Sequence, residues 1–163
     1  MKKYSRILII VNLLLLLGYF NWSVVKKEQT LKDGQLVLLE LAPVDPRSLM
    51  QGDYMRLNYK ESALDSKDEK IAPHGYAILS TDSNRVGQII RLQESLEPVK
   101  EDELVVKYKI ANGRLILGAE SFFFEEGQDT LYQQAKYGGL KVNEKGESLL
   151  VGLYDEDLRL IQP

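Results

Sequence analysis

The stretch PVDPRSLMQGDYMRLNY, residues 43–59, decides the fold, because it joins a structured turn to an alternating strand. Pro43 ends the apolar run before it, since proline has no N–H to donate to a strand ladder. Asp45-Pro46 starts a turn, and Gly52 supplies a position where φ can be positive. From Asp53 onward the side chains alternate between two faces. The stretch therefore predicts a strand–turn–strand unit.

The alternation predicts which face of the second strand is buried. Met55, Leu57 and Tyr59 share one face, and this face is the more apolar, so we expect it to meet the core. Tyr54 lies on the other face with Arg56 and Asn58. A buried tyrosine needs a hydrogen-bond partner for its hydroxyl. We interpret Tyr54 and Tyr59 as packed aromatic residues rather than stacking platforms for a ligand.

The charged residues around the turn, Asp45, Arg47, Asp53 and Arg56, allow two interpretations. In the structural one, the carboxylates accept backbone N–H groups and an arginine supplies the counter-charge. In the functional one, the same side chains form a polar site at the rim of the strands. We favour the structural interpretation.

The same stretch resembles a known family. Gly52, Asp53, Tyr54, Leu57 and Tyr59 fill every fixed place of the motif GDYXXLXY, and the preceding Asp45, Pro46 and Arg47 are similar to the family's lead-in. The resemblance runs from about Leu36 to Leu153 and includes a second region at residues 122–127. It implies a membrane-anchored bacterial protein but no activity and no catalytic residues. These eight residues are the candidate site.

Residues 7–25 form an apolar segment of 19 residues. As a helix it would span about 28 Å, close to the hydrocarbon core of a bilayer. No small-x-small cleavage site follows it, so we expect an uncleaved signal-anchor helix, with a cleaved signal peptide as the alternative. Lys2, Lys3 and Arg6 precede the segment. This bias favours a single-pass protein of the inner membrane, with residues 1–6 in the cytoplasm and the rest outside.

Charge and composition exclude several classes of function. Residues 28–163 hold 16 of the 21 basic residues and all 24 acidic residues, a net charge of −8. An acidic domain without a basic stripe is a poor match for nucleic acid. The chain has no cysteine, which excludes disulfides, thiol nucleophiles and thiolate metal sites.

We expect a polar linker over residues 26–35 and one domain over residues 36–163. Its class is α+β, predominantly β: one N-terminal transmembrane helix, then a single β-rich domain with one short helix. The helix is predicted over residues 127–137 and ended by Gly138-Gly139. Turns are predicted at residues 73–75, Asn112-Gly113 and Gly146, and a loop over residues 61–70. Strands are predicted over residues 36–41, 54–59, 76–80, 86–93, 104–111, 114–117, 120–124 (aromatic and buried), 140–142, 149–154 and 158–161.

No complete catalytic set is visible, so we expect no enzyme, no cofactor and no metal site. Ser48 and Lys60 are the nearest approach to a Ser-Lys dyad, but the turn lacks the family pattern of such peptidases. His74 is the only histidine, and we expect it in an exposed turn. The acidic groups at residues 155–157 and at Asp65, Asp68 and Glu69 lack calcium-ligand spacing and are interpreted as solvated.

Three functional hypotheses follow. The first is a non-enzymatic extracytoplasmic accessory or binding domain held at the membrane, and the resemblance suggests a multi-spanning membrane protein as its partner. The alternative is an envelope hydrolase of Ser-Lys or carboxylate type, centred on residues 45–60. It requires Asp45, Ser48, Asp53 and Lys60 to share one cleft. The third is binding of a small ligand or an envelope polymer in a groove.

Overall fold

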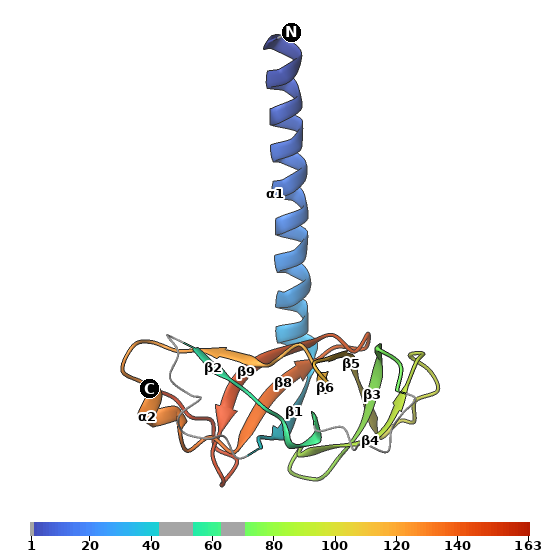
Figure 1. The fold of residues 1–163 in the computed structure, drawn as a ribbon, viewed down its shortest axis with the longest axis vertical. Helices are drawn as coiled ribbons and strands as arrows, with labels where there is room; N and C mark the ends of the chain where they lie inside the picture. Colours follow the sequence, from blue (N-terminus) through green and yellow to red (C-terminus); the bar gives the residue numbers. More distant parts are fainter. Residues whose placement is uncertain (1, 43–53, 63–70) are drawn as a thin grey trace.

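A long helix stands on a β-rich domain (Figure 1). The structure is a computed structural model that describes residues 2–42, 54–62 and 71–163. Helix α1, Lys2–Asp33, has 32 residues, and its apolar part is long enough to cross a membrane and is not buried by any described part of the protein. At about 1.5 Å per residue the helix measures about 48 Å. The fold class predicted from the sequence is confirmed.

The polar linker expected over residues 26–35 is corrected by the structure. Residues 26–33 continue α1, and a single residue, Gly34, separates the helix from strand β1, Gln35–Glu40. The sequence KKEQTLKD consists mostly of good helix formers, and Glu28 pairs with Lys32 one turn later at 3.1 Å. The helix therefore enters the domain without a flexible joint.

Nine strands in the described part of the chain form three sheets. One sheet has the order β1-β8-β9, with β8 at Tyr137–Val142 and β9 at Ser148–Tyr154. A second has the order β4-β3-β5-β6, with bounds Gly87–Gln93, His74–Thr81, Glu103–Ala111 and Arg114–Ile116. The third pairs β2, Tyr54–Arg56, with β7, Ser121–Phe123. All strand pairs within these sheets are antiparallel.

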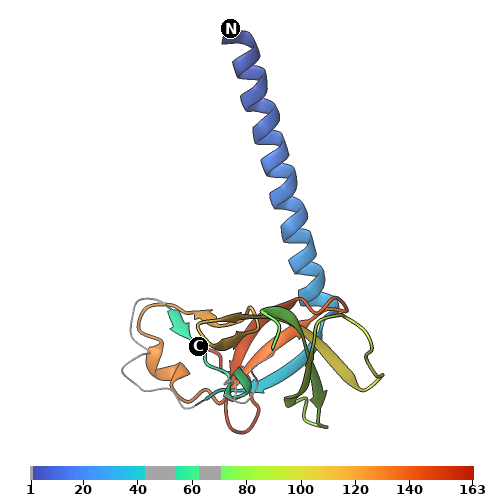
Figure 2. The same ribbon diagram turned by 45° about the vertical axis from the view of Figure 1, so that its right-hand side comes forward.

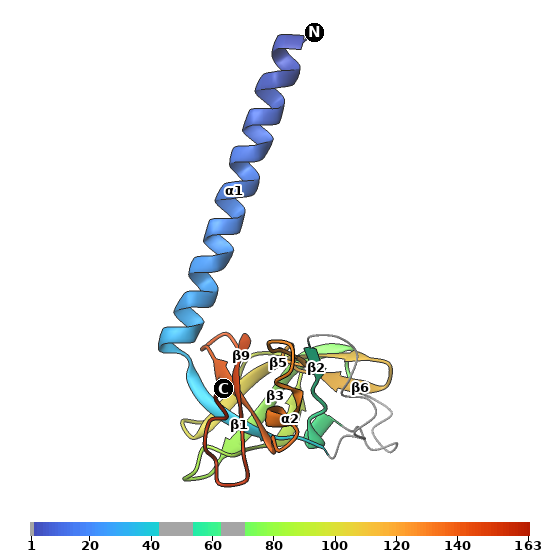
Figure 3. The ribbon, with the colours of Figure 1, turned by 90° about the vertical axis from the view of Figure 1, so that its left-hand side faces the viewer.

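One hydrophobic core lies between the two larger sheets. It contains Leu39 of β1, Leu79 of β3, Val106 of β5 and Leu140 of β8, all fully buried. The sheets also meet at their edges, because the Leu38 N–H donates to the Arg85 carbonyl next to β4 at 2.8 Å. Figures 2 and 3 show the same domain from two further sides.

Most strands and tight turns agree with the predictions. β1, β3, β4, β5, β6, β8 and β9 each lie within a few residues of a predicted strand. Asn112 and Gly113 have φ angles of 52° and 70°, as a two-residue hairpin turn requires. Gly146, with φ at 76°, makes the predicted turn between β8 and β9.

The predicted helix over residues 127–137 is wrong in length. Helix α2 spans only Asp129–Tyr132. Backbone groups of Lys136 already belong to the sheet: its N–H donates to Tyr154 and its carbonyl accepts from Leu41, both at 2.8 Å. Gly138 and Gly139, predicted to end the helix, lie in β8, where tyrosine rings cover them. A Cβ on Gly138 would lie 2.9 Å from the Tyr59 ring.

Three smaller predictions are also corrected. His74 and Gly75 begin β3 rather than forming a turn, although His74 is exposed as expected. The strand expected over residues 158–161 is reduced to one bridge between Tyr154 and Leu160, since Leu158 has a φ of 60° that breaks an extended run. β7 was expected to be buried, but Phe123 is 74% exposed.

The motif strand is fixed in the core by Tyr59. Its side chain is 1% exposed, and its hydroxyl donates to the Ala119 carbonyl at 2.6 Å. Burial, with a smaller effect of the Glu120 charge, raises the pKa of the Tyr59 hydroxyl well above its usual range. Ser62, in the short 3₁₀ helix η2 (Lys60–Ser62), donates its hydroxyl to the Tyr59 carbonyl at 2.6 Å. The hydroxyl and the backbone carbonyl of Tyr59 are therefore both held by buried hydrogen bonds.

We predict that Tyr59→Phe lowers the free energy of unfolding by about 1–3 kcal/mol, because the buried Ala119 carbonyl loses its donor. Urea unfolding of the full chain in detergent measures the change. Tyr54→Phe is the matched control, since this tyrosine of the same strand is 40% exposed, and its cost should stay below about 0.5 kcal/mol. Equal losses of unfolding free energy in Tyr59→Phe and Tyr54→Phe would contradict a stabilising role for the Tyr59–Ala119 hydrogen bond.

Candidate functional site

Of the candidate motif residues, the structure describes Tyr54, Leu57 and Tyr59, and these three do not share one surface. Leu57, like Tyr59, is 1% exposed and part of the core, whereas Tyr54 is 40% exposed. Arg56 is also exposed, as the alternation of the strand predicts. The other motif and turn residues lie outside the described residues; they are Asp45, Pro46, Arg47, Ser48, Gly52 and Asp53. The loop predicted over residues 61–70, with Asp65, Asp68 and Glu69, lies outside them from residue 63 onward.

Lys60 is poorly suited to act as a general base. Its side chain is exposed, and its Nζ donates to Glu40 Oε2 at 3.0 Å. The hydrogen bond and charge of Glu40 raise the pKa of Lys60. A catalytic lysine base needs the opposite shift, because only the neutral amine accepts a proton. Lys60, the proposed base of the hydrolase hypothesis, is therefore held in its charged form by Glu40.

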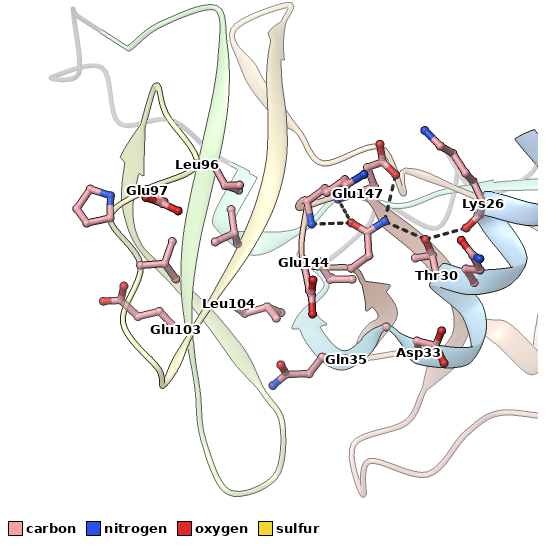
Figure 4. Close-up of a pocket in the computed structure, with 18 residues that line it drawn as sticks. Lys26, Thr30, Asp33, Gln35, Leu96, Glu97, Glu103, Leu104, Glu144 and Glu147 are labelled. Atoms are coloured by element: carbon pink, nitrogen blue, oxygen red, sulfur yellow. Dashed lines mark hydrogen bonds between the residues drawn. The ribbon is translucent and has the colours of Figure 1, made fainter.

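A groove of about 1050 Å³ lies elsewhere, where the helix enters the domain (Figure 4). Three segments far apart in the sequence form its walls. These are the end of α1 with the start of β1, residues 96–99 with the start of β5, and the turn between β8 and β9. The groove is therefore built into the junction of helix and domain.

The helix side of the groove is fixed by Thr30. This residue is 6% exposed, and its hydroxyl donates to the Lys26 carbonyl one turn earlier at 3.2 Å. Asn143, in the β8–β9 turn, donates its side-chain Nδ2 to the same hydroxyl at 3.0 Å. Figure 4 shows this chain of contacts from helix to turn. The last turn of α1 is thus bonded to the sheet.

Gly34 allows the sharp change from helix to strand. Its N–H donates to the Thr30 carbonyl at 3.0 Å, and its carbonyl accepts from Lys141 Nζ at 2.8 Å. A Cβ at this position would lie 2.4 Å from the Thr30 carbonyl oxygen, a distance that real Cβ atoms do not reach. Only glycine fits here without moving the backbone.

Asn143 also organises the turn on the other wall. Its Oδ1 accepts the backbone N–H groups of Lys145 and Glu147, both at 3.0 Å. Its Nδ2 donates to Glu147 Oε2 at 3.1 Å, and this bond, together with the charge of Lys107, lowers the pKa of Glu147. One amide therefore holds both the turn and the helix.

The groove is predominantly acidic. Five carboxylates and two lysines line it, namely Asp33, Glu97, Glu103, Glu144, Glu147, Lys26 and Lys145. Glu103 is paired with Arg91 through two hydrogen bonds of 2.6 Å, and Glu147 with Lys107 at 3.5 Å. The negative charge offered to a ligand therefore comes from Asp33, Glu97 and Glu144, which exceed the two lining lysines, Lys26 and Lys145, by one charge. Such a surface favours positively charged, hydrogen-bonding groups.

The family assignment rests on most of the chain rather than on the motif alone. The sequence model described as GDYXXLXY protein matches residues 16–153. The chain belongs to the GDYXXLXY family. No curated protein and no solved structure matches the chain significantly. In this GDYXXLXY protein, the described part of the signature stretch has an architectural role at Leu57 and Tyr59, and an exposed aromatic ring at Tyr54.

The remaining candidate residues do not form a site in the described part of the GDYXXLXY protein. No group of three or more His, Asp or Glu side chains there is placed to hold a metal ion. Asp155 accepts the Arg159 N–H at 2.8 Å and so serves a turn. The groove was missed by sequence reasoning, because its walls come from three separate segments and carry no shared motif.

We predict that Glu103 contributes stability that depends on pH. The hydrogen bonds from Arg91 and the Lys100 N–H lower the pKa of the Glu103 carboxyl to about 2, below its unfolded value of about 4.3. This contribution is complete above about pH 5 and is lost as the pH falls through 4 toward 2. Glu103→Gln should therefore destabilise the protein at pH 7 but much less near pH 3, as measured by urea unfolding at each pH.

The matched control is Glu101→Gln, two residues earlier and exposed. Its effect should be small at both pH values. A destabilisation by Glu103→Gln that is the same at pH 7 and pH 3 would contradict the prediction.

Proposed function

We propose that this GDYXXLXY protein is a single-pass inner-membrane protein whose β domain is an extracytoplasmic, non-enzymatic accessory subunit. The observation that carries the proposal is α1. Its ten side chains at residues 7–11 and 13–17 are apolar and all between 46% and 70% exposed. Consecutive residues of a helix point in every direction, so α1 is apolar all round. Water is an unfavourable environment for such a surface, and a bilayer is a favourable one.

Charge supports the orientation. Lys2, Lys3 and Arg6 precede the apolar run, and no acidic residue lies before Glu28. Lys26 and Lys27 follow the run but are succeeded by a domain of net negative charge. The larger local excess of basic groups before the apolar run favours a cytoplasmic N-terminus. The domain then lies on the extracytoplasmic side.

The groove supports a binding role at the membrane. It lies at the base of α1, so any occupant must approach close to the bilayer surface. Its lining combines carboxylates with apolar side chains such as Leu96, Val99 and Leu104, which suits an extracytoplasmic loop of a multi-spanning membrane protein that carries basic residues. The Thr30–Asn143 hydrogen bond keeps the groove in a fixed position relative to the helix. A partner can therefore recognise helix and groove together.

A photo-crosslinking experiment in native membranes tests this role. A photoreactive amino acid replaces Gln29, an exposed residue of the groove wall. We predict a discrete adduct with one membrane protein. The double charge reversal Glu97→Lys/Glu144→Lys should weaken this adduct at least about tenfold, because like charges then face the partner's loop.

The matched control is Glu156→Lys/Asp157→Lys, which makes the same change in net charge. These two residues follow β9, whose other end meets α1, so they lie at the end of the domain away from the helix (Figure 1). The control should leave the adduct unchanged. No adduct from protein found in the membrane fraction, or equal loss in both double variants, would contradict the proposal.

A further inference from the structure

The outer face of the β2–β7 sheet carries a pair of exposed aromatic rings. Tyr54 and Phe123 are directly opposite each other in the antiparallel register, with ring centroids 5.8 Å apart. They are 40% and 74% exposed, and Phe123 is the most exposed large apolar residue of the described β domain. Arg56, which pairs with Ser121, lies on the same face and is exposed as well. The patch therefore combines two aromatic rings with one cationic side chain.

The inner face of this sheet fixes the direction in which the patch points. Met55 and Phe122 form the inner cross-strand pair; Met55 is buried, and the Phe122 ring contacts the ring of Tyr132 in α2 at 4.9 Å between centroids. In Figures 1 and 3, where both elements are labelled, α2 lies lower than β2, on the side opposite to the direction in which α1 projects. The outer face with Tyr54 and Phe123 therefore points to the side from which α1 projects.

The attachment of α1 brings this face close to the bilayer. Residues 26–33, between the apolar run and the domain, add only about 12 Å of helix. The polar headgroup layer takes up about 5–7 Å of that distance. Figures 2 and 3 also show that α1 leans over the half of the domain that carries β2. With α1 upright in the membrane, this half of the domain is raised toward the headgroups.

We propose that Tyr54 and Phe123 insert into the interfacial layer of the membrane that α1 crosses, as a second contact of the domain with lipid. This inference rests on the membrane anchoring given above. Aromatic rings are enriched at this depth, and Tyr19 and Trp22 of α1 already lie at the same end of the membrane span. Arg56 is placed to donate to lipid phosphates.

The chemistry of the contact is chiefly apolar. Glu125 and Glu126, which follow β7, are exposed, and the domain is acidic, so anionic lipid does not attract it. The contact should therefore depend on the aromatic rings and hardly on ionic strength. Together with α1, it fixes the rotation of the domain on the membrane and hence the direction in which the groove opens.

Tryptophan quenching by lipid tests the proposal in the purified full chain, reconstituted in nanodiscs. Trp22 is the only tryptophan, so the double variant Trp22→Phe/Phe123→Trp places a single reporter in the patch. Lipids brominated near the headgroup should quench this reporter at least half as strongly as they quench Trp22 in the unaltered protein. The quenching should persist between about 0.05 M and about 0.5 M salt, because the aromatic rings, rather than the Arg56 contact with phosphate, supply most of the binding.

The matched control is Trp22→Phe/Asp157→Trp. Asp157 has a side chain that is 66% exposed, close to the value for Phe123, but lies in the turn after β9. This reporter should not be quenched. Quenching of Trp22 without quenching at position 123 would overturn the proposed lipid contact but not the membrane anchoring by α1. The Tyr54–Phe123 patch would then be expected to contact a protein partner. Absence of quenching at Trp22 itself would overturn the membrane anchoring as well.

Discussion

The hydrogen bond from Asn143 to Thr30 is the contact on which the arrangement of the whole molecule depends. It joins the last turn of α1 to a turn between two sheet strands, over a sequence separation of 113 residues. Gly34 makes the same junction short, because its backbone can follow the helix end directly into β1. A single-pass anchor is often followed by a flexible linker, which leaves the orientation of the domain free. Here the helix and the domain are one unit.

The bonded junction between α1 and the domain fixes the positions of two separate surfaces relative to the helix. The groove lies at the base of the helix, and the Tyr54–Phe123 pair lies on the face of the domain that is proposed to contact the membrane. In the proposed arrangement, the junction between helix and domain holds both surfaces at a fixed height and direction relative to the bilayer. The groove carries carboxylates and suits a protein loop, whereas the patch is aromatic and suits lipid. The two proposed contacts therefore complement each other.

The sequence predicted those features that local patterns determine, and missed those that distant partners determine. The alternation in β5 and the Asn112-Gly113 turn are local, as is the apolar run of α1. Residues 26–33 are charged enough to resemble a linker, and although their composition permits a helix, the distant Asn143 and Lys141 are what dock its end on the sheet. Gly138-Gly139 resembles a helix stop until the rings of Tyr59 and Tyr154 are seen to cover both glycines.

The same limit applies to the candidate site. Alternation correctly placed Leu57 and Tyr59 in the core, but three consecutive phenylalanines do not reveal which one faces out. The cross-strand partner Tyr54 decides this for Phe123. The groove has walls from three separate segments, so no local pattern could predict it.

A distance measurement between helix and domain tests the rigid junction most directly. The chain has no cysteine, so Lys27→Cys/Lys109→Cys places spin labels only on α1 and β5, both at exposed positions. Pulsed electron resonance of the full chain in nanodiscs should give one narrow distance distribution, as narrow as for labels at Lys109 and Glu156 within the domain. A distribution as broad as that of a variant with a Gly-Ser insertion between Asp33 and Gly34 would contradict the account.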